Sequence, residues 1–250
     1  MVPVDRRSFS KSTIGSLLAY SVLETICVSD VLGAELKPIA ARWLAELNNR
    51  SNDLRGRELT QIEWQSEIEK LFAQVDLNEF LSYVDFERLI KNMQFRDKGE
   101  RAFRAKFPAV EGLPTKLAFG HQMFALKKSQ SVVPHGHNNM ATAFLILRGD
   151  FHGRHYDRLE DEEQHLIVKP TIDRRFAVGE YSTVSDQKDN VHWFKAMSDT
   201  AYIFNIHLLN VDPEIKRGGR VYIDPKGEQL SGGKIRARKI KAKEAFQLYG

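Results

Sequence analysis

Cysteine is almost absent from this chain of 250 residues, because Cys27 is the only one, and an intramolecular disulfide is therefore excluded. Long apolar runs are also missing, and no stretch approaches the roughly 20 residues that a membrane-spanning helix needs. We find no internal repeat and no glycine-rich phosphate loop. The remaining composition, with 42% hydrophobic and 28% charged residues, is typical of a soluble globular protein that can bury a core.

Positive charge is unevenly distributed along the sequence. The formal net charge is +4, but residues 216 to 243 alone hold ten Lys or Arg and two acids, so the rest of the chain is mildly acidic. Basic clusters can bind nucleic acid or anionic lipid. This cluster lacks interleaved aromatic residues and presents no clear recognition helix. We therefore favour a solvated surface and expect no nucleic-acid partner.

The first 34 residues resemble a twin-arginine export signal. Arg6-Arg7 are followed by Phe9 and Lys11, then by a weakly apolar stretch and by small residues near Ala34. The sequence departs from the usual pattern at Asp5, at Ser10 and at the charges that interrupt the apolar stretch. We predict export to the periplasm, with no stable membrane insertion once the signal is removed; otherwise the protein is cytoplasmic.

Residues 35–107 have a helical pattern. Trp43, Leu44 and Leu47 fall on one apolar face, and similar stripes follow in 62–72 and 80–90. The polar breaks between the stripes mark helix ends. We interpret these aromatic and aliphatic residues as core, and the region as a helical layer that packs on the part of the chain that follows.

After Pro108 the sequence consists of short apolar runs separated by Gly, Pro, Asp and Asn, which is the pattern of β-strands. About eight such runs occur between residues 117 and 223, and this number predicts a sandwich or a jelly-roll barrel. The predicted fold is mainly β, with a barrel at 108–215, the helical layer before it, and a basic C-terminal extension at 216–250 that packs on the barrel.

Two histidines separated by one residue stand out in the predicted barrel. On an extended segment, His135 and His137 project from the same face, so both can reach one metal ion. A third ligand should come from another strand, and His192 is the best candidate because it opens a strand after a polar turn. We predict the metal ligands His135, His137 and His192.

These residues resemble the two motifs of the cupin family, in which a Pro-x-His-x-His segment precedes a glycine and a second segment supplies a later histidine. The glutamate ligand of the first cupin motif has no counterpart near Ala141 or Thr142, so the site would consist of three imidazoles. Within cupins, the spacing of His135, His137, Met140, Gly149, His152 and Tyr156-Asp157 is similar to that of the thiol dioxygenases of the cysteamine dioxygenase and plant cysteine oxidase group.

The likeness covers about a third of the chain and ends where that group positions its thiol substrate. Asn205 stands where the group has an Asp, and the following Pro-Pro-Tyr run is missing. Asn205 and His207 share a strand face, and the resemblance implies that this face points into the barrel. We therefore name Tyr156, Asn205 and His207 as candidate catalytic residues. The alternative interpretation of Tyr156 is a packing residue of the barrel. The alternative interpretation of His207 is a core histidine that forms a local hydrogen bond.

The resemblance implies a non-haem Fe(II) dioxygenase that acts on a small anionic or thiol substrate and on dioxygen. Three neutral imidazoles leave a divalent ion with its full charge, which favours an anionic ligand. Zn, Mn or Ni would also suit the three imidazoles. The alternatives are a zinc-type hydrolase or isomerase and a non-catalytic exported cupin that holds a metal or another ligand. The fold also permits a homodimer.

Overall fold

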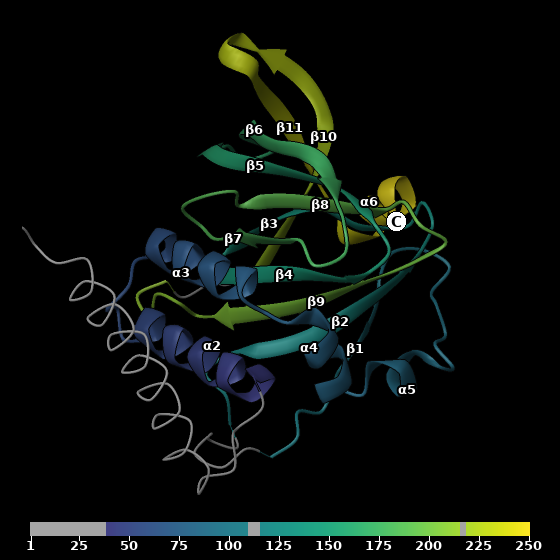
Figure 1. The fold of residues 1–250 in the computed structure, drawn as a ribbon. Helices are drawn as coiled ribbons and strands as arrows, with labels where there is room; N and C mark the ends of the chain where they lie inside the picture. The colour runs from purple at the N-terminus through teal and green to yellow at the C-terminus, as the bar shows by residue number, and fades with distance from the viewer. Residues whose placement is uncertain (1–38, 110–115, 216–218) are drawn as a thin grey trace, which may run out of the picture. The chain divides into compact units, whose positions relative to one another are not determined.

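The computed structural model describes residues 39–109, 116–215 and 219–250, and these belong to one compact unit, Ile39–Gly250. The predicted export signal lies outside the described residues. In the chain, α2 to α5 come before all the described strands and α6 comes after them (Figure 1). The helices are α2 (Ile39–Arg55), α3 (Gln61–Ala73), α4 (Leu77–Tyr83), α5 (Phe86–Ile90) and α6 (Ala242–Tyr249), with the 3₁₀ turn η1 at Ser231–Gly233.

The starts of α3 and α4 are fixed by side-chain caps. Thr60 and Glu63 form a capping box at α3, in which each side chain accepts a hydrogen bond from the other residue's backbone N–H. At α4 the Asp76 carboxylate accepts a hydrogen bond from the backbone N–H of Glu79. These two caps account for the polar breaks between the apolar stripes in the sequence.

One antiparallel sheet has the strand order β1-β2-β9-β4-β7. Its strands are β1 (Arg101–Phe103), β2 (Gly120–Lys127), β4 (Met140–Arg148), β7 (Tyr181–Val184) and β9 (Thr200–Leu209). Strand β4 is buried over almost its whole length because both of its faces are covered. Ala143 and Leu145 face the apolar cluster that also contains Trp43, Trp64 and Phe80 of the helices. Phe144 and Ile146 face the opposite way, toward the second sheet.

The second sheet closes into a barrel in the order β10-β11-β6-β5-β8-β3. Its strands are β3 (Ser131–Asn138), β5 (Phe151–Asp161), β6 (His165–Phe176), β8 (Val191–Ala196), β10 (Gly219–Leu230) and β11 (Lys234–Ile240). All neighbouring pairs described are antiparallel. The described residues therefore have the mainly β architecture that the sequence predicted, with antiparallel sheets and a closed barrel.

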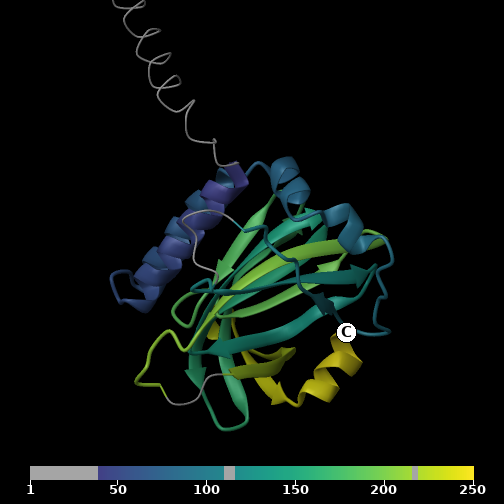
Figure 2. The same ribbon diagram turned by 90° about the horizontal axis from the view of Figure 1, so that it is seen from below.

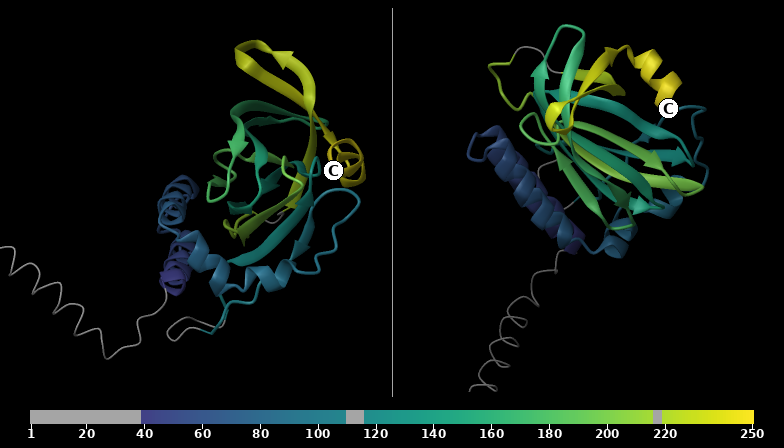
Figure 3. Two further views of the ribbon diagram at one scale, coloured as in Figure 1. Left: turned by 45° about the vertical axis from the view of Figure 1, so that its right-hand side comes forward. Right: turned by 90° about the horizontal axis from the view of Figure 1, so that it is seen from above.

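The basic C-terminal segment is part of this barrel. β10 pairs with β3, and β11 pairs with β6, so the barrel extends past the predicted boundary at residue 215. Figures 1 and 3 show β10 and β11 continuing beyond the other strands as a long hairpin. In β11, Ile235 and Ala237 are buried, and the alternate residues Arg236 and Arg238 point outward.

Several bases of this segment are paired with acids. Arg236 lies 2.8 Å from Glu162, Arg238 lies 2.6 Å from Glu244, and Lys239 pairs with Asp161. Much of the local positive charge is therefore balanced by the neighbouring elements.

Helix α6 covers the outer face of the barrel near β3. Ala245 and Tyr249 pack with Val133, next to Trp193 and Tyr222. Figure 2 shows this helix, in yellow, across the strands from α2 and α3. No described helix has both the length and the apolar character that a membrane crossing requires.

Candidate metal centre

His135 and His137 lie near the end of β3, and a β-bulge turns them toward the space between the sheets. Val132 pairs with Phe194, and His135 pairs with His192. The two paired residues are therefore three positions apart in β3 but only two positions apart in β8. In a regular strand Val132 and His135 would point to opposite faces, and the bulge places both on the inner face. The two histidines lie in the last four residues of β3, and Asn139, with φ of 56°, separates this strand from β4.

The structure brings together the three predicted ligands. The candidate ligand nitrogens of His135, His137 and His192 all lie within 4.8 Å of one another. The ring centroids are 4.8, 4.3 and 5.0 Å apart for the pairs 135/137, 135/192 and 137/192. Each residue is at most 2% exposed. Because two nitrogens bound to one ion at about 2.1 Å are at most about 4.2 Å apart, small side-chain rotations suffice to bind it.

Burial keeps the three imidazoles neutral, which is the form that binds metal. Desolvation, with the nearby Arg220 charge, lowers the pKa of His135 to about 3. Desolvation and the neighbouring histidines likewise lower the pKa values of His137 and His192 well below their usual range. His135 Nδ1 lies 2.7 Å from the Val133 carbonyl oxygen and donates to it, which leaves Nε2 with a free lone pair.

The polar atoms of the cluster fit a metal ion. Within the described residues, neither ring nitrogen of His137 has a hydrogen-bond partner, and Nδ1 of His192 has none. Buried polar atoms without partners destabilise a fold, so such a group calls for an explanation. Three imidazoles that can hold an ion provide one, and no other cluster of three His, Cys, Asp or Glu ligands occurs in the described ranges.

The cavity at the histidines is small. Its volume is about 10 Å³, close to that of a single water-sized sphere, which is room enough for an ion beside the three histidines. Phe124, Val132 and Phe144 line its apolar side, and Met140, Thr142 and Asn205 line the rest, together with the histidines and Arg220.

Arg220 is a residue of this cavity that the sequence interpretation missed. Its strand β10 pairs with β3, and Arg220 is directly opposite His137. Its side chain is exposed, and it has no hydrogen bond or ion pair with any residue in the described ranges. In the sequence, Arg220 is one of ten bases in a polar tail, and only the pairing of β10 with β3 distinguishes it.

Asn205 also lines the cavity, and its orientation is fixed by hydrogen bonds. Its side-chain amide donates to Thr142 Oγ1 at 2.6 Å and to the Ala143 carbonyl at 3.2 Å. His207 is half-buried on the same strand face, with Nδ1 at 3.3 Å from Asn205 Oδ1. Desolvation lowers the pKa of His207 to about 4. His207 is therefore a neutral group beside Asn205, and it does not line the cavity itself.

Tyr156 lies away from the three histidines. Its ring packs with Leu166, Val168 and Val191 inside the barrel, and it is not among the residues that line the cavity. The pairing of β5 with β8 is regular here, with His155 opposite His192 and Tyr156 opposite Val191, so Tyr156 points to the face opposite His155. The described structure therefore gives Tyr156 the packing role that was the alternative in the sequence interpretation.

His155 is a second buried histidine near the cluster. It is fully buried, and its ring centroid is 6.4 Å from that of His192. Its Nε2 lies 3.1 Å from Ser182 Oγ, and its ring packs on Phe176 and Phe194. It is not part of the metal-ligand group.

Comparisons with known proteins identify no relative by sequence. No family model matches the chain, and no curated protein matches it. Solved structures similar to it include procruciferin, an 11S globulin from Brassica napus, at 9% identity, an 11S globulin from Wrightia tinctoria at 12%, and an 11S allergen from Cocos nucifera at 14%.

Each of these matches has a TM-score of 0.31 and covers 42% of this chain. They cover only 22%, 22% and 24% of the respective globulin chains, so this chain corresponds to less than a quarter of each. A TM-score of 0.31 is too low to support an inference about family or function. The possible metal site rests on the geometry of the three histidines.

Proposed function

We propose that this protein is a mononuclear non-haem iron dioxygenase that acts on a small anionic or thiol substrate. The observation that carries the proposal is the presence of three buried neutral imidazoles and an unpaired Arg220 at the same cavity. A bound ferrous ion would supply the redox chemistry with dioxygen. Three neutral ligands leave its full charge for an anionic group of the substrate.

Arg220 gives a second reason to expect an anionic substrate. Its guanidinium can donate two parallel hydrogen bonds to a carboxylate, and its exposed position at the cavity allows contact with a ligand that enters from solvent. The substrate would thus bind with its anionic group at Arg220 and its reacting end toward the histidines.

The other lining residues limit the access of water and orient polar groups. Phe124 and Phe144 cover the apolar side of the cavity, which lowers the local dielectric and strengthens interactions between charges. The Asn205 amide is held by Thr142 and Ala143, so Asn205 presents its carbonyl oxygen toward His207 and Gln122. Asn205 could then form a hydrogen bond to the substrate, and the neutral imidazole of His207 could accept a proton from it.

The small cavity favours a second candidate, a non-catalytic exported cupin that holds a metal. A space of about 10 Å³ accommodates an ion without an organic substrate. This alternative predicts tight metal retention without turnover. A zinc-type hydrolase or isomerase would instead be active without dioxygen.

Anaerobic reconstitution with Fe(II), followed by measurement of dioxygen uptake across a panel of thiols and diketones, tests the proposal. We expect uptake with at least one anionic member of the panel, and none with the His192→Ala variant. The control is His165→Ala, which removes a partly exposed histidine of β6. Uptake by His192→Ala equal to that of the wild type, or no uptake by the iron-loaded wild type, would contradict the proposal.

Metal analysis separates the alternatives. Iron in protein purified without added metal supports the dioxygenase, whereas retained zinc with activity under nitrogen supports a hydrolase or isomerase. Stoichiometric metal without any turnover supports the non-catalytic cupin.

Export by the twin-arginine route is part of the same proposal, and it rests on Arg6-Arg7, Phe9 and Lys11. Fractionation of cells that express the full chain should place it in the periplasm. Replacing Arg6 and Arg7 with lysines should retain it in the cytoplasm, and an unchanged periplasmic fraction would contradict the proposal.

A further inference from the structure

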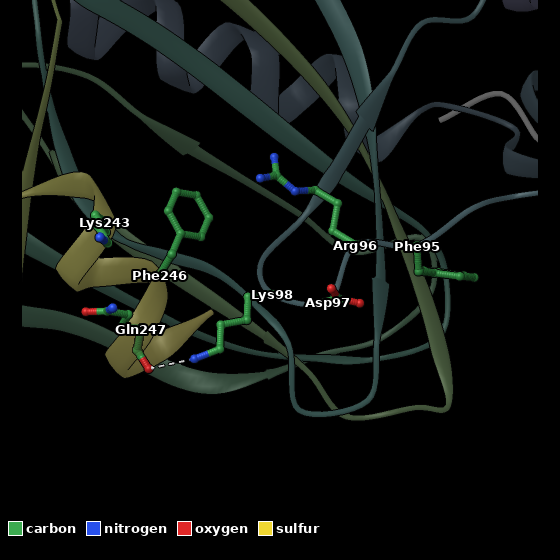
Figure 4. A pocket seen from close by; sticks show the side chains of 7 residues that line it. All are labelled: Phe95, Arg96, Asp97, Lys98, Lys243, Phe246 and Gln247. Atoms are coloured by element: carbon green, nitrogen blue, oxygen red, sulfur yellow. Dashed lines mark hydrogen bonds between the residues drawn. The ribbon is translucent and has the colours of Figure 1, made fainter.

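A second hollow lies on the outer surface, and it shares no lining residue with the cavity at the three histidines. It has a volume of about 660 Å³ and lies between residues 95–98 and helix α6. Figure 4 shows Arg96 and Lys98 extending toward the helix, which contributes Lys243, Phe246 and Gln247. This volume is within the usual range for small-molecule sites.

The two walls of the hollow are fixed against each other. Gly99 has φ of 70°, and a Cβ there would lie 2.3 Å from the Phe246 ring, so the segment touches the helix closely. Lys98 Nζ donates to the Gln247 carbonyl at 3.4 Å, and the Gln130 amide donates to the Arg96 carbonyl at 2.7 Å. The hollow is therefore formed without any ligand.

The charge of the hollow is positive and uncompensated. Arg96, Lys98 and Lys243 face a single acid, Asp97, and none of the three bases forms an ion pair with a carboxylate of the described residues. The bases of β11 differ, because Arg236, Arg238 and Lys239 each pair with an acid. Burial raises the pKa of the nearby Glu100 carboxyl, which weakens its tendency to ionise beside Arg96.

Two aromatic rings complete the hollow. Phe95 packs on the apolar cluster under the helices and on Tyr202, while Phe246 packs on the cluster at α6. The Arg96 guanidinium lies 5.9 Å from the centroid of the Phe246 ring. An aromatic side chain and a guanidinium plane both stack favourably on a planar ligand ring.

We propose that this hollow binds a small phosphorylated ligand that carries a planar ring, as a mononucleotide does. The three bases would bind the phosphate, with Arg96 placed to donate two hydrogen bonds, and the ring would pack against Phe246 or Phe95. The site is separate from the metal centre, and its occupancy does not depend on the proposed oxygenase activity.

Isothermal titration calorimetry of the full chain, as purified with its metal, tests this site with AMP, adenosine and orthophosphate. We expect saturable binding of AMP, weaker binding of both fragments, and a loss of affinity as salt is raised, because the contacts are partly exposed charges. Adenosine that binds as tightly as AMP would overturn the role of the three bases. Orthophosphate that binds as tightly as AMP would overturn the role of the ring.

Variants locate the binding. Arg96→Gln and Lys243→Gln should each weaken AMP about tenfold or more, since each removes a charge-assisted contact. Lys169→Gln, which removes an exposed lysine of β6, should have no effect. His192→Ala should also leave AMP affinity unchanged, because it removes a ligand of the other site. Equal affinities in Arg96→Gln and Lys169→Gln, or no saturable AMP binding by the wild type, would overturn the proposal.

Discussion

The space between the two sheets differs in chemistry from one end to the other, although the same strands build both ends. One end is packed with apolar side chains, including Phe151, Phe176 and Phe194. The other end holds the histidines, and strand β8 passes from His192 to Phe194 within two residues. Three other strands also have an apolar residue at one end and a polar residue at the other. These pairs are Val132 and His135 in β3, Ile146 and Thr142 in β4, and Ile203 and Asn205 in β9.

This difference separates stability from function along the strands. The apolar end gains free energy from the burial of side-chain area. The histidine end has buried nitrogens without partners, which reduces the stability of the metal-free protein. Such a site lowers the free energy of unfolding when no metal is bound and raises it when metal is bound. Metal binding is thereby coupled to folding.

The largest effect on metal binding should follow removal of a histidine at the polar end. In His137→Leu, metal content should fall almost to zero, while the free energy of unfolding of the metal-free protein should rise by about 1–3 kcal/mol, because two unpartnered buried nitrogens are removed. Elemental analysis and urea unfolding measure the two quantities. His165→Ala should keep its metal, and a metal-free His137→Leu that is less stable than the wild type would contradict the comparison.

At the apolar end, replacing a buried ring should lower the stability of the protein and leave its metal content unchanged. Phe194→Ala leaves a cavity in a fully buried cluster, so the free energy of unfolding should fall by about 3–5 kcal/mol. Metal content of the folded fraction should stay at the wild-type level, because Phe194 does not line the metal cavity. A Phe194→Ala protein that folds but binds no metal would show that the two ends are not independent.

Asn205 lies at the histidine end without being a predicted metal ligand, and its loss should have an intermediate effect. Asn205→Ala removes the donor to Thr142 Oγ1 and the Ala143 carbonyl, which should lower the free energy of unfolding by about 1–3 kcal/mol. Thermal unfolding with and without metal measures it. If Asn205 also contacts substrate, oxygen uptake by the iron-loaded variant should fall, and unchanged uptake would restrict Asn205 to a structural role.

The smallest effect at neutral pH is that of His155, which borders both ends and affects the stability of the protein only in acid. Burial lowers its pKa from about 6.5 to about 3, so between these values the unfolded chain binds a proton that the folded chain does not. Stability therefore falls as pH decreases from about 6.5, by up to about 1.4 kcal/mol per pH unit for this group. His155→Gln should flatten the pH dependence of urea unfolding by that amount, and an unchanged slope would exclude the contribution.

The sequence was sufficient to group His135, His137 and His192 as a possible metal site and to predict the class of fold. Spacing in a strand predicts which side chains share a face, and this placed His135 with His137. The pattern also predicted a mainly β chain, because apolar runs and turn residues alternate over short intervals. The resemblance to thiol dioxygenases stays a prediction, since nothing in the comparisons tests it.

Other features depend on register and pairing, which a single sequence does not reveal. The bulge before His135 sets the inner face of β3, and the pairing of β5 with β8 places Tyr156 with Val191 in the barrel cluster. Strand β11 carries so many charges that its apolar residues, Ile235 and Ala237, are inconspicuous. Arg220 became a site residue only through its pairing with His137 across strands far apart in the chain.

The same pairing has a consequence for synthesis of the protein. The ligand strand β3 is bordered on one side by β8 and on the other by β10, which comes after β3 to β9 in the chain. Because contacts between distant segments form slowly, the histidines are enclosed only after β10 has been synthesised and has paired with β3. A chain that stops before β10 would expose the edge of β3 to other strands, so premature termination should yield aggregates rather than a smaller metal-binding protein.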